Sequence, residues 1–574
     1  MQKRQWIIRP ADLRSAQLAK SLKVSPLLAQ VLINRGVTDP QAGSVFLRPK
    51  LTELIAPEQM PGVEAAVPRI KHAITNREKI TIYGDYDVDG ITGASILWQI
   101  LMLLGANVDY YIPHRVDEGY GLNEDAVRSL AQAQSKLLIT VDCGIGAFGS
   151  AALAEQLGLE LIITDHHQPG EELPKAAAIV HPAMDKSYPN QCSSGAMVAF
   201  KLAWAVANQF SAGRKLQDPL REFMLNATSL AAMGTIADVV DLRGENRVLT
   251  SYGLRALPQC RLFGIQALIE SAGLTGQGLD TFDIGFRLAP ILNAAGRMGH
   301  ARLAVELLTS DNQVRSMRIA EYLKEQNTQR QQCERKIFKR ACEMIAQQGL
   351  GHPDRKSIVL AADNWHTGVI GIVASRIVDK FYRPAIMFNS ANGIAQGSAR
   401  SIEGFDIFSA ISACSGHLVD FGGHKMAAGL TIKTEKIPQF TADFESYAAK
   451  NLNDDDVVAK LNVDAAVPLV RFSKEAVAEM QMLGPFGRGN PEPVFATNGV
   501  HLASLPRKVG ANGGHLQLAI TDNTASIRCV GFGFGKLEKK LLEHQFFNVA
   551  YQPQLNTYNG SDNVQLVLAD IQFE

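Results

Sequence analysis

Aspartates and an adjacent pair of histidines gather in four short segments of this sequence. The segments are Gly84-Asp85-Tyr86-Asp87-Val88-Asp89-Gly90, Val141-Asp142-Cys143-Gly144, Thr164-Asp165-His166-His167 and Gly234-Thr235-Ile236-Ala237-Asp238. Each acid ends or follows an apolar run typical of a buried strand, as at residues 80–83, 137–141 and 161–164. Aspartates at the carboxyl ends of neighbouring parallel strands converge on one crevice, where open α/β sheets bind ligands. Because several carboxylates cannot gather there as bare anions, the pattern predicts bound cations.

The mixture of ligand types indicates which cations these are. Carboxylates outnumber histidines, which favours Mn²⁺ or Mg²⁺ over Zn²⁺. Two such ions about 3.5–4 Å apart are the usual arrangement for displacement at phosphorus, where they activate water and stabilise oxyanions. A calcium loop starting at Asp85 would need a glutamate at its twelfth position, where this chain has Ile96. A single aspartate after a strand is more often a turn former or helix cap, but four such loops together favour a metal site.

The expected elements divide the chain into five parts. Residues 1–49 are predicted to form a helical cap on the next part, and residues 50–311 a mainly parallel sheet with helices on both faces. Residues 312–349 predict one connecting helix of roughly 55 Å. Residues 350–452 predict a smaller α/β domain, and residues 453–574 a small β-barrel of the OB type.

More detailed expectations accompany these parts. Helices are expected at residues 94–104, 195–210 and 369–380, and strands at 108–112, 357–361, 384–388, 515–520 and 526–532. The connecting helix carries basic residues in excess of acidic ones. That excess fits either a solvated connector or a surface that faces nucleic acid.

Composition sets the class of protein. The chain has 574 residues, of which 46% are hydrophobic, so several domains with large cores are expected. No stretch has the length of a membrane span, and the N-terminus lacks the apolar centre of a signal peptide. Seven scattered cysteines without a CxxC pair favour the reducing cytoplasm and argue against a zinc ribbon. A formal net charge of zero leaves any nucleic-acid partner to local basic patches.

In this order, the four acidic segments resemble the motifs of the DHH phosphoesterase superfamily, which is named for its Asp-His-His motif. Within it the chain resembles the RecJ family, the exonucleases specific for single-stranded DNA. The string Leu292-Asn293-Ala294-Ala295-Gly296-Arg297 is also RecJ-like. Residues 365–371, 397–400 and 421–424 resemble the companion domain called DHHA1, and the β-rich end agrees with the OB-fold of that family. The resemblance covers nearly the whole chain.

The resemblance implies a ligand set for two divalent cations, Mn²⁺ or Mg²⁺. The expected ligands are Asp85, Asp87, Asp89, Asp142, His166 and Asp238. Asp87 and Asp142 would bind one ion, with Asp85 nearby, and Asp142 would bridge to the second. Tyr83 stands where many relatives have histidine. Since tyrosine is a poor Mn²⁺ ligand, the first ion would be bound more weakly or would recruit Asp85.

Two further residues of the third segment are expected to act in catalysis. By the same resemblance, His167 would contact the scissile phosphate or support the ligands from behind. Asp165 would orient a histidine through a hydrogen bond.

The substrate's phosphates require donors of their own. Arginine recognises a terminal phosphate in bidentate fashion, and a Gly-Gly-His string lets the backbone approach one closely. The candidates are Arg115, Arg297, Ser398, Arg400, Gly422, Gly423, His424 and, beside a glycine-rich loop of the barrel, Lys508. Taken singly, each arginine would more often form a surface salt bridge.

The resemblance implies a metal-dependent exonuclease that degrades single-stranded DNA from 5′ to 3′ into 5′-mononucleotides. It also implies recombinational and mismatch repair, with single-strand-binding protein and a repair helicase as partners. One alternative is a phosphodiesterase of the same superfamily that acts on short oligonucleotides, cyclic dinucleotides or pyrophosphates, which would not need the C-terminal barrel. A non-enzymatic scaffold would have lost the acids that are all present here.

Overall fold

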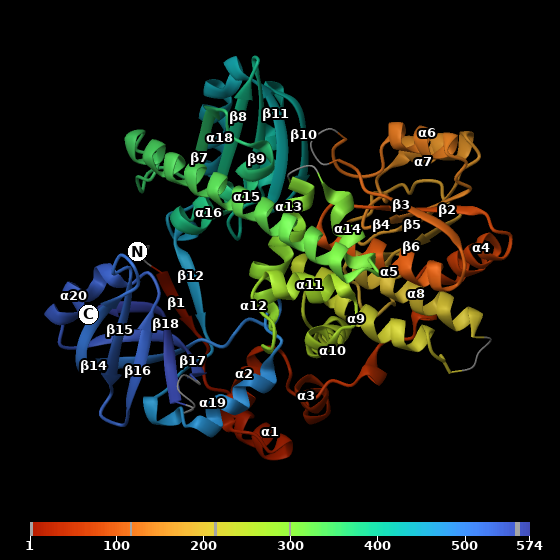
Figure 1. Ribbon diagram of the computed structural model, residues 1–574. Coiled ribbons are helices and arrows are strands. Elements are labelled where there is room, and N and C mark those ends of the chain that lie inside the picture. The colour runs from red at the N-terminus through yellow and green to blue at the C-terminus, as the bar shows by residue number, and fades with distance from the viewer. Residues whose placement is uncertain (1–3, 115–117, 212–214, 298–299, 557–562, 574) are drawn as a thin grey trace. The chain divides into compact units, whose positions relative to one another are not determined.

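The computed structural model describes residues 4–114, 118–211, 215–297, 300–556 and 563–573 (Figure 1). These residues form two compact units. Among these residues, the first unit comprises those within 54–240 and 249–459, and the second unit those within 4–53, 241–248 and 460–573.

The first unit is built around a parallel five-stranded sheet. In spatial order its strands are β3 (Asn107–Tyr111), β2 (Lys79–Gly84), β4 (Leu137–Val141), β5 (Glu160–Thr164) and β6 (Ala178–Val180). β4 is buried along its whole length, and β2 and β5 are buried except at their first residues, because helices cover both faces. The predicted parallel sheet is confirmed.

Helices of different size cover the two faces of this sheet. Figure 1 shows α6 (Glu124–Gln132) and α7 (Phe148–Gln156) on one side, and α5 (Val88–Leu103) and α8 (Gly195–Phe210) on the other. α6 and α7 pack on Tyr83, Leu138 and Ile163 of the strands. The opposite face joins a much larger core, which extends into further helices of this unit.

Those helices complete the first unit's larger core. They are α4 (Val63–Thr75), α9 (Leu220–Ala237), α10 (Gly244–Ala256, which begins in the second unit), α11 (Phe263–Ser271), α13 (Ala289–Arg297) and α14 (Ala301–Thr309), whereas the short helix α12 (Thr281–Asp283) buries no residue. The predicted connecting helix is α15 (Gln313–Gln347). Part of its basic character is internal, because buried Arg330 donates 3.0 Å hydrogen bonds to Asn327 and Glu334 of the same helix.

A second, mixed sheet forms the rest of the first unit. Its spatial order is β10 (Leu418–His424), β11 (Ala427–Lys433), β9 (Ile394–Arg400), β8 (Ala385–Ala391) and β7 (Ile358–Asp363). Only β7 and β8 run parallel. The helices α16 (Thr367–Phe381), α17 (Ile407–Ala413) and α18 (Ile437–Asn451) share its core. This is the smaller α/β domain that the sequence predicts.

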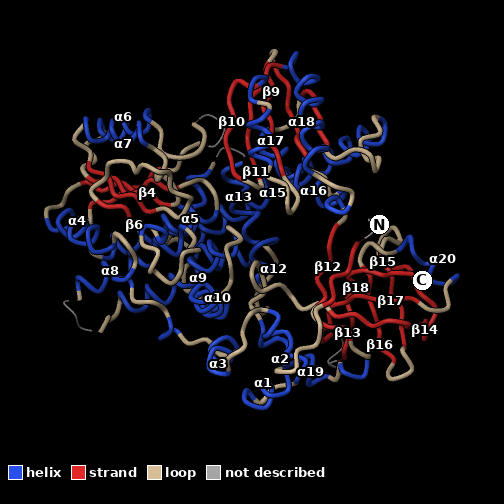
Figure 2. The backbone as a smooth tube through the Cα atoms, turned by 180° about the vertical axis from the view of Figure 1, so that it is seen from behind, coloured by secondary structure: helices blue, strands red, loops and turns tan. Residues whose placement is uncertain are grey.

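The second unit contains a closed five-stranded barrel, seen as the strand cluster at the C-terminus in Figure 2. Its strands are β14 (Phe495–Val509), β15 (His515–Thr521), β16 (Ser526–Gly531), β18 (Asn563–Phe573) and β17 (Phe547–Asn556), and β17 pairs back with β14. The parallel pair β16–β18 between otherwise antiparallel neighbours gives the OB-type connectivity. The predicted barrel is therefore confirmed.

Segments from the N-terminus complete the second unit. Strand β1 (Arg4–Ile8) pairs with β12 (Ala459–Val463), and β13 (Ala465–Ala466) with β14. The helices α1 (Ser15–Leu22), α2 (Pro26–Asn34), α3 (Pro40–Leu47), α19 (Lys474–Met480) and α20 (Glu538–Glu543) pack with the barrel. The sequence analysis instead expected the N-terminal helices to cap the part that follows them. The domain boundaries themselves stay predictions.

No helix among the described ranges combines the length and the apolar character needed to cross a membrane.

One buried arginine ties together three distant segments of the second unit. The guanidinium of Arg247 donates to the carbonyl oxygens of Phe46 at 2.8 Å, Met482 at 3.3 Å and Gly484 at 2.6 Å. It also stacks on the Phe46 ring at 3.8 Å, and burial lowers the pKa of Arg247 to about 10.

We therefore expect Arg247→Met to destabilise the second unit by about 3 kcal/mol, because buried carbonyls lose their donors. Calorimetric unfolding would measure the change. Arg255→Met, an exposed arginine further along α10, is the matched control and should have little effect. Equal losses in both variants would contradict this account of Arg247.

Candidate metal centre and substrate-binding residues

Three neighbouring strands deliver the central carboxylates. β2 lies beside β4 and β4 beside β5, with Gly84 opposite Val141 in the register. Asp85, Asp142 and Asp165 each follow the last residue of one of these strands. Because parallel strands end at the same edge of a sheet, the three loops meet there.

The helix that follows the first strand places two more aspartates. Asp87 is the N-cap of α5, and its Oδ1 accepts from the backbone N–H of Asp89 at 2.9 Å and of Gly90 at 3.2 Å. Asp89 lies in the first turn and accepts from the N–H groups of Gly195 at 2.6 Å and Ala196 at 2.9 Å, at the start of α8. The N-terminus of α8 therefore clamps Asp89 in one orientation.

Asp238 reaches the same place from a different kind of element. The sequence pattern predicts that every acid ends or follows a strand, and for Asp238 that prediction is wrong. It is the C-cap of α9, so helix packing brings it to the crevice. Asp142 has a left-handed backbone (φ 65°), which is uncommon for a residue other than glycine.

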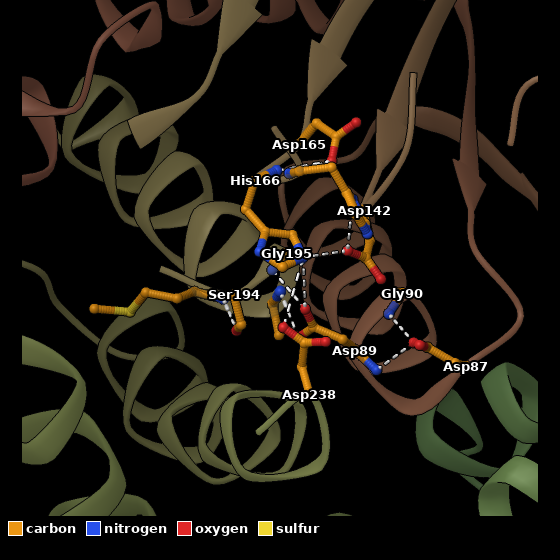
Figure 3. Close-up of polar contacts among 12 residues, drawn as sticks. Asp87, Asp89, Gly90, Asp142, Asp165, His166, Ser194, Gly195 and Asp238 are labelled. Atoms are coloured by element: carbon orange, nitrogen blue, oxygen red, sulfur yellow. Dashed lines mark hydrogen bonds and ion pairs between the residues drawn. The ribbon is translucent and has the colours of Figure 1, made fainter. Parts of the chain in front are cut away.

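The side chains converge within a few ångströms (Figure 3). The His166 Nε2 atom lies 3.0 Å from Asp142 Oδ1, 3.7 Å from Asp238 Oδ2 and 3.8 Å from Asp89 Oδ2. Among the described residues, three groups have ligand atoms within 4.8 Å of one another: Asp85, Asp87 and Asp142; Asp89, His166 and Asp238; and Asp142, His166 and His167. The described part of the chain thus gathers every predicted metal ligand.

The electrostatics of this cluster require positive charge. Burial, together with the charges of Asp89 and Asp87, raises the pKa of Asp142 well above its usual range. Burial and the charge of Asp87 raise the pKa of Asp89 to about 7. A divalent cation would remove this penalty, because it favours the ionised carboxylates.

The unsatisfied atoms fit such a cation. Asp142 Oδ1 and His166 Nε2 face each other in the interior, and neither has a hydrogen-bond partner in the described structure. Burial, reinforced by the charge of His167, lowers the pKa of His166 to about 4, so the ring is neutral and a lone pair is available. Carboxylate oxygens with one neutral imidazole suit Mn²⁺ or Mg²⁺.

His167 is held in a different state from its neighbour. Its Nδ1 lies 2.8 Å from Asp165 Oδ1, which also accepts from the backbone N–H groups of His166 and His167. Burial opposes its protonation, but the hydrogen bond to Asp165 and that carboxylate's charge raise the pKa of His167 to about 9. Asp165 thus orients and charges His167, while His166 faces the carboxylates.

Tyr83 is not placed as a ligand. Its side chain is fully buried against Tyr111, with ring centroids 5.4 Å apart, and its hydroxyl donates to the carbonyl of Gly121 at 2.9 Å. The group of Asp85, Asp87 and Asp142 forms without it.

The predicted phosphate donors of the second sheet lie on one face. Ser398 and Arg400 are two residues apart on β9, and a Cβ added to Gly371 of α16 would lie 2.8 Å from Ser398 Oγ and 3.0 Å from Arg400 Nη2. Gly371 thus lets α16 approach both donors. Arg400 Nη1 also donates to the Ala399 carbonyl at 2.7 Å.

The Gly-Gly-His string extends the same rows across the sheet. Ser398 pairs with Gly429, which pairs with Gly422, and Arg400 pairs with Ala427, which pairs with His424. Directly opposed residues share a face, so His424 lies on the Arg400 face about 10 Å away, across two strand spacings. The glycines and alanine between them leave this face open, whereas Gly423 points to the other side.

The remaining candidates for phosphate binding are Arg297, Arg115 and Lys508. Arg297 ends α13 and its Nη1 donates to the Gly368 carbonyl at 2.8 Å. Arg115 lies outside the described residues. Lys508, on the barrel, forms a 2.8 Å ion pair with Glu538.

The sequence analysis missed other residues. Ser194, whose side chain caps α8, and Gly195 hold Asp89 in place, and the polar residues before an apolar helix were a readable signal. On the barrel, Arg528 lines a groove of about 500 Å³ together with Arg507 and polar side chains such as Gln517 and Gln565. Only the strand register reveals that these residues share one face.

Gly195 offers a test of the metal site. A Cβ there would lie 2.6 Å from the Asp142 Cβ and 2.7 Å from its Oδ1. We expect Gly195→Ala to weaken Mn²⁺ binding by about 10- to 100-fold, measured by titration calorimetry on metal-free protein. Gly278→Ala, where an added Cβ meets nothing, is the control. Unchanged affinity in Gly195→Ala would contradict the ligand assignment of Asp142 and Asp89.

Comparisons with known proteins agree with this arrangement. Three family models match the chain: "DHH family, N-terminal domain" at residues 79–234, "DHHA1 domain" at 354–450 and "RecJ OB domain" at 463–570. The single-stranded-DNA-specific exonuclease RecJ of Bacillus subtilis (strain 168) is 40% identical over 99% of this chain and 71% of its own length. The protein of that name from Haemophilus influenzae is 33% identical over 97% of each chain.

A solved structure matches as well. The crystal structure of RecJ in complex with Mn²⁺ from Thermus thermophilus superposes with a TM-score of 0.85 and 30% identity, covering 100% of this chain and 80% of that one. The chain belongs to the RecJ family.

Proposed function

We propose that the chain is a metal-dependent exonuclease that degrades single-stranded DNA from 5′ to 3′ and releases 5′-mononucleotides. The observation that carries this proposal is the complete ligand cluster centred on Asp142, which lies in two of the three candidate metal groups. The names of the relatives, single-stranded-DNA-specific exonucleases, support the substrate class. The Mn²⁺ complex of the Thermus protein supports the choice of ion.

The ligands divide between two ions. Asp87 and Asp142, with Asp85, would hold one Mn²⁺ or Mg²⁺ ion, and Asp89, Asp142, His166 and Asp238 the other. When bound, these ions supply Lewis acidity and a nucleophile at neutral pH. No serine or cysteine nucleophile is assigned, because phosphodiester hydrolysis at such a site needs none.

The chain's own residues position the substrate. Asp165 keeps the His167 ring charged and oriented, so that His167 donates a hydrogen bond to a non-bridging oxygen of the scissile phosphate. Ser398 and Arg400, with Gly422 and His424 on the same face, bind the phosphate at the 5′ end. Arg297, at the end of α13, also binds a substrate phosphate.

The cellular setting follows the same proposal. Recombinational and mismatch repair, with single-strand-binding protein and a repair helicase as partners, is proposed from the resemblance to the RecJ family. A cytoplasmic location is supported by the cysteines, because the described structure joins none of them in a disulfide.

Product analysis tests the direction and the substrate. With Mn²⁺, single-stranded DNA labelled at its 5′ end should release a labelled mononucleotide from the first turnover, whereas a 3′ label should appear late. EDTA should abolish the reaction. Asp142→Ala should lower the rate by more than roughly 100-fold, the loss typical of residues that only support the metal ligands. Cleavage confined to dinucleotides would contradict the proposal and favour the short-substrate branch of the superfamily.

Arg400 should determine recognition of the 5′ phosphate. A charge-assisted hydrogen bond contributes about 1.5–3 kcal/mol, so Arg400→Gln should raise KM for 5′-phosphorylated DNA at least about tenfold. DNA with a 5′ hydroxyl should be affected much less. Lys433→Gln, an exposed cation at the far end of β11, is the matched control. An equal change of KM for both DNA ends would rule out this role of Arg400.

A further inference from the structure

A tyrosine that the proposed function leaves out lies over the metal centre. Tyr120 belongs to the loop before α6 and is 55% exposed. Its hydroxyl lies 3.3 Å from the backbone carbonyl oxygen of Asp142 and 3.2 Å from the ring nitrogens of His167. Its ring meets the His167 ring edge to face, with centroids 5.7 Å apart. One side chain thus touches both the loop of the shared metal ligand and the predicted phosphate donor.

The backbone around Tyr120 is built to present it. Gly119 and Gly121 have φ values of 80° and 86°, a region that side-chain-bearing residues rarely adopt. A Cβ on either glycine would meet no other atom, so the glycines serve the backbone conformation and not a close approach.

Hydrogen bonds from the sheet fix this loop. The buried Tyr83 hydroxyl donates to the Gly121 carbonyl at 2.9 Å. The Tyr111 hydroxyl donates to Glu118 at 2.7 Å, and Asn123 donates to Tyr83 at 3.2 Å and to Glu118 at 3.3 Å. The stacked pair of Tyr83 and Tyr111 therefore anchors the loop on both sides of Tyr120.

The His167 ring needs a second contact of this kind. Asp165 holds it at Nδ1, and a ring held at one nitrogen can still tilt about that bond. The Tyr120 hydroxyl contacts the ring from another side, 3.2 Å from both ring nitrogens, and donates to the Asp142 carbonyl at 3.3 Å. A shift of about 1 Å in such a group can cost 100-fold in rate, so the second contact matters for chemistry.

We propose that Tyr120 is a positioning residue that fixes the His167 ring over the scissile phosphate, and that the Tyr83 hydroxyl places Tyr120. The kinetic part of this proposal rests on the proposed function. Tyr83 thereby has a role of its own: it supports the loop that orients His167 and does not bind metal.

The test compares Tyr120→Phe and Tyr83→Phe with the wild type. Tyr120→Phe removes only the hydroxyl, and we expect kcat on single-stranded DNA to fall about 10-fold or more with KM unchanged. Tyr83→Phe should produce the same change of kcat to a smaller extent. Tyr110→Phe, the same substitution at the neighbouring position of β3, whose ring packs on Trp98, is the matched control and should keep wild-type kinetics.

A second readout does not depend on activity. In metal-free protein at one pH, diethylpyrocarbonate modification of His167, followed by peptide mass spectrometry, should be severalfold faster in Tyr120→Phe. The exposed His352 provides the internal reference. This comparison still decides the role of Tyr120 if the protein degrades no single-stranded DNA and the proposed function fails.

Two results would overturn the proposal. Wild-type kcat together with wild-type His167 reactivity in Tyr120→Phe would show that the hydroxyl does not hold the ring. A rise of KM alone, in both Tyr120→Phe and Tyr120→Ala, would make Tyr120 a substrate contact instead.

Discussion

Repulsion between carboxylates in a buried crevice is the constraint on which the rest of this structure depends. Burial and the acidic neighbours raise the pKa of Asp142, so the carboxylates cannot all ionise unless positive charge compensates them. The fold supplies part of it locally: the N–H groups at the start of α8 meet Asp89, and those at the start of α5 meet Asp87. These backbone dipoles favour negative charge but are too weak to offset several carboxylates. The remaining deficit is what a pair of divalent cations would remove.

The two histidines show how one short loop produces opposite electrostatic states. The His166 Nε2 atom faces the carboxylates without making a hydrogen bond, and burial keeps its ring neutral. The next residue, His167, forms a hydrogen bond with the Asp165 carboxylate, which keeps its ring protonated. Asp165 itself stays ionised: burial favours its neutral form, but the hydrogen bond from His167, the charge of that ring and the backbone N–H donors together outweigh burial and lower the pKa of Asp165 to about 2. Adjacent imidazoles can thus serve as a metal ligand and as a cationic donor within one site.

The sequence allowed the positions of the aspartates that follow strands to be predicted. Other site residues could not be placed in this way, because tertiary packing decides where they lie. Asp85, Asp142 and Asp165 follow apolar runs, and parallel strands must end at one edge, so their convergence follows from local pattern alone. Asp238 caps a helix, and only tertiary packing decides where that end lies. The same holds for Gly195, which must be glycine because of a neighbour far away in sequence. Tyr83 could be noticed as a departure from the family pattern, but not as an anchor, because its partner is a backbone carbonyl. The barrel arginines Arg507 and Arg528 become neighbours only through the strand register.

A neutral chain with an acidic crevice raises the question of how it admits a polyanion. The formal net charge is zero, so net charge supplies no attraction for DNA, and the carboxylates around Asp142 would repel a phosphate. Donors such as Arg400 lie on a separate sheet, and Arg507 and Arg528 on the barrel. The phosphate backbone can therefore be held by arginines at several places, yet enter the crevice only when its acids are neutralised. Divalent cations and a phosphate must then bind the crevice with positive coupling, and thermodynamic reciprocity requires that each strengthens the other. On the proposed function, the acid cluster would confine hydrolysis to the metal-loaded enzyme, while the arginines would hold the strand.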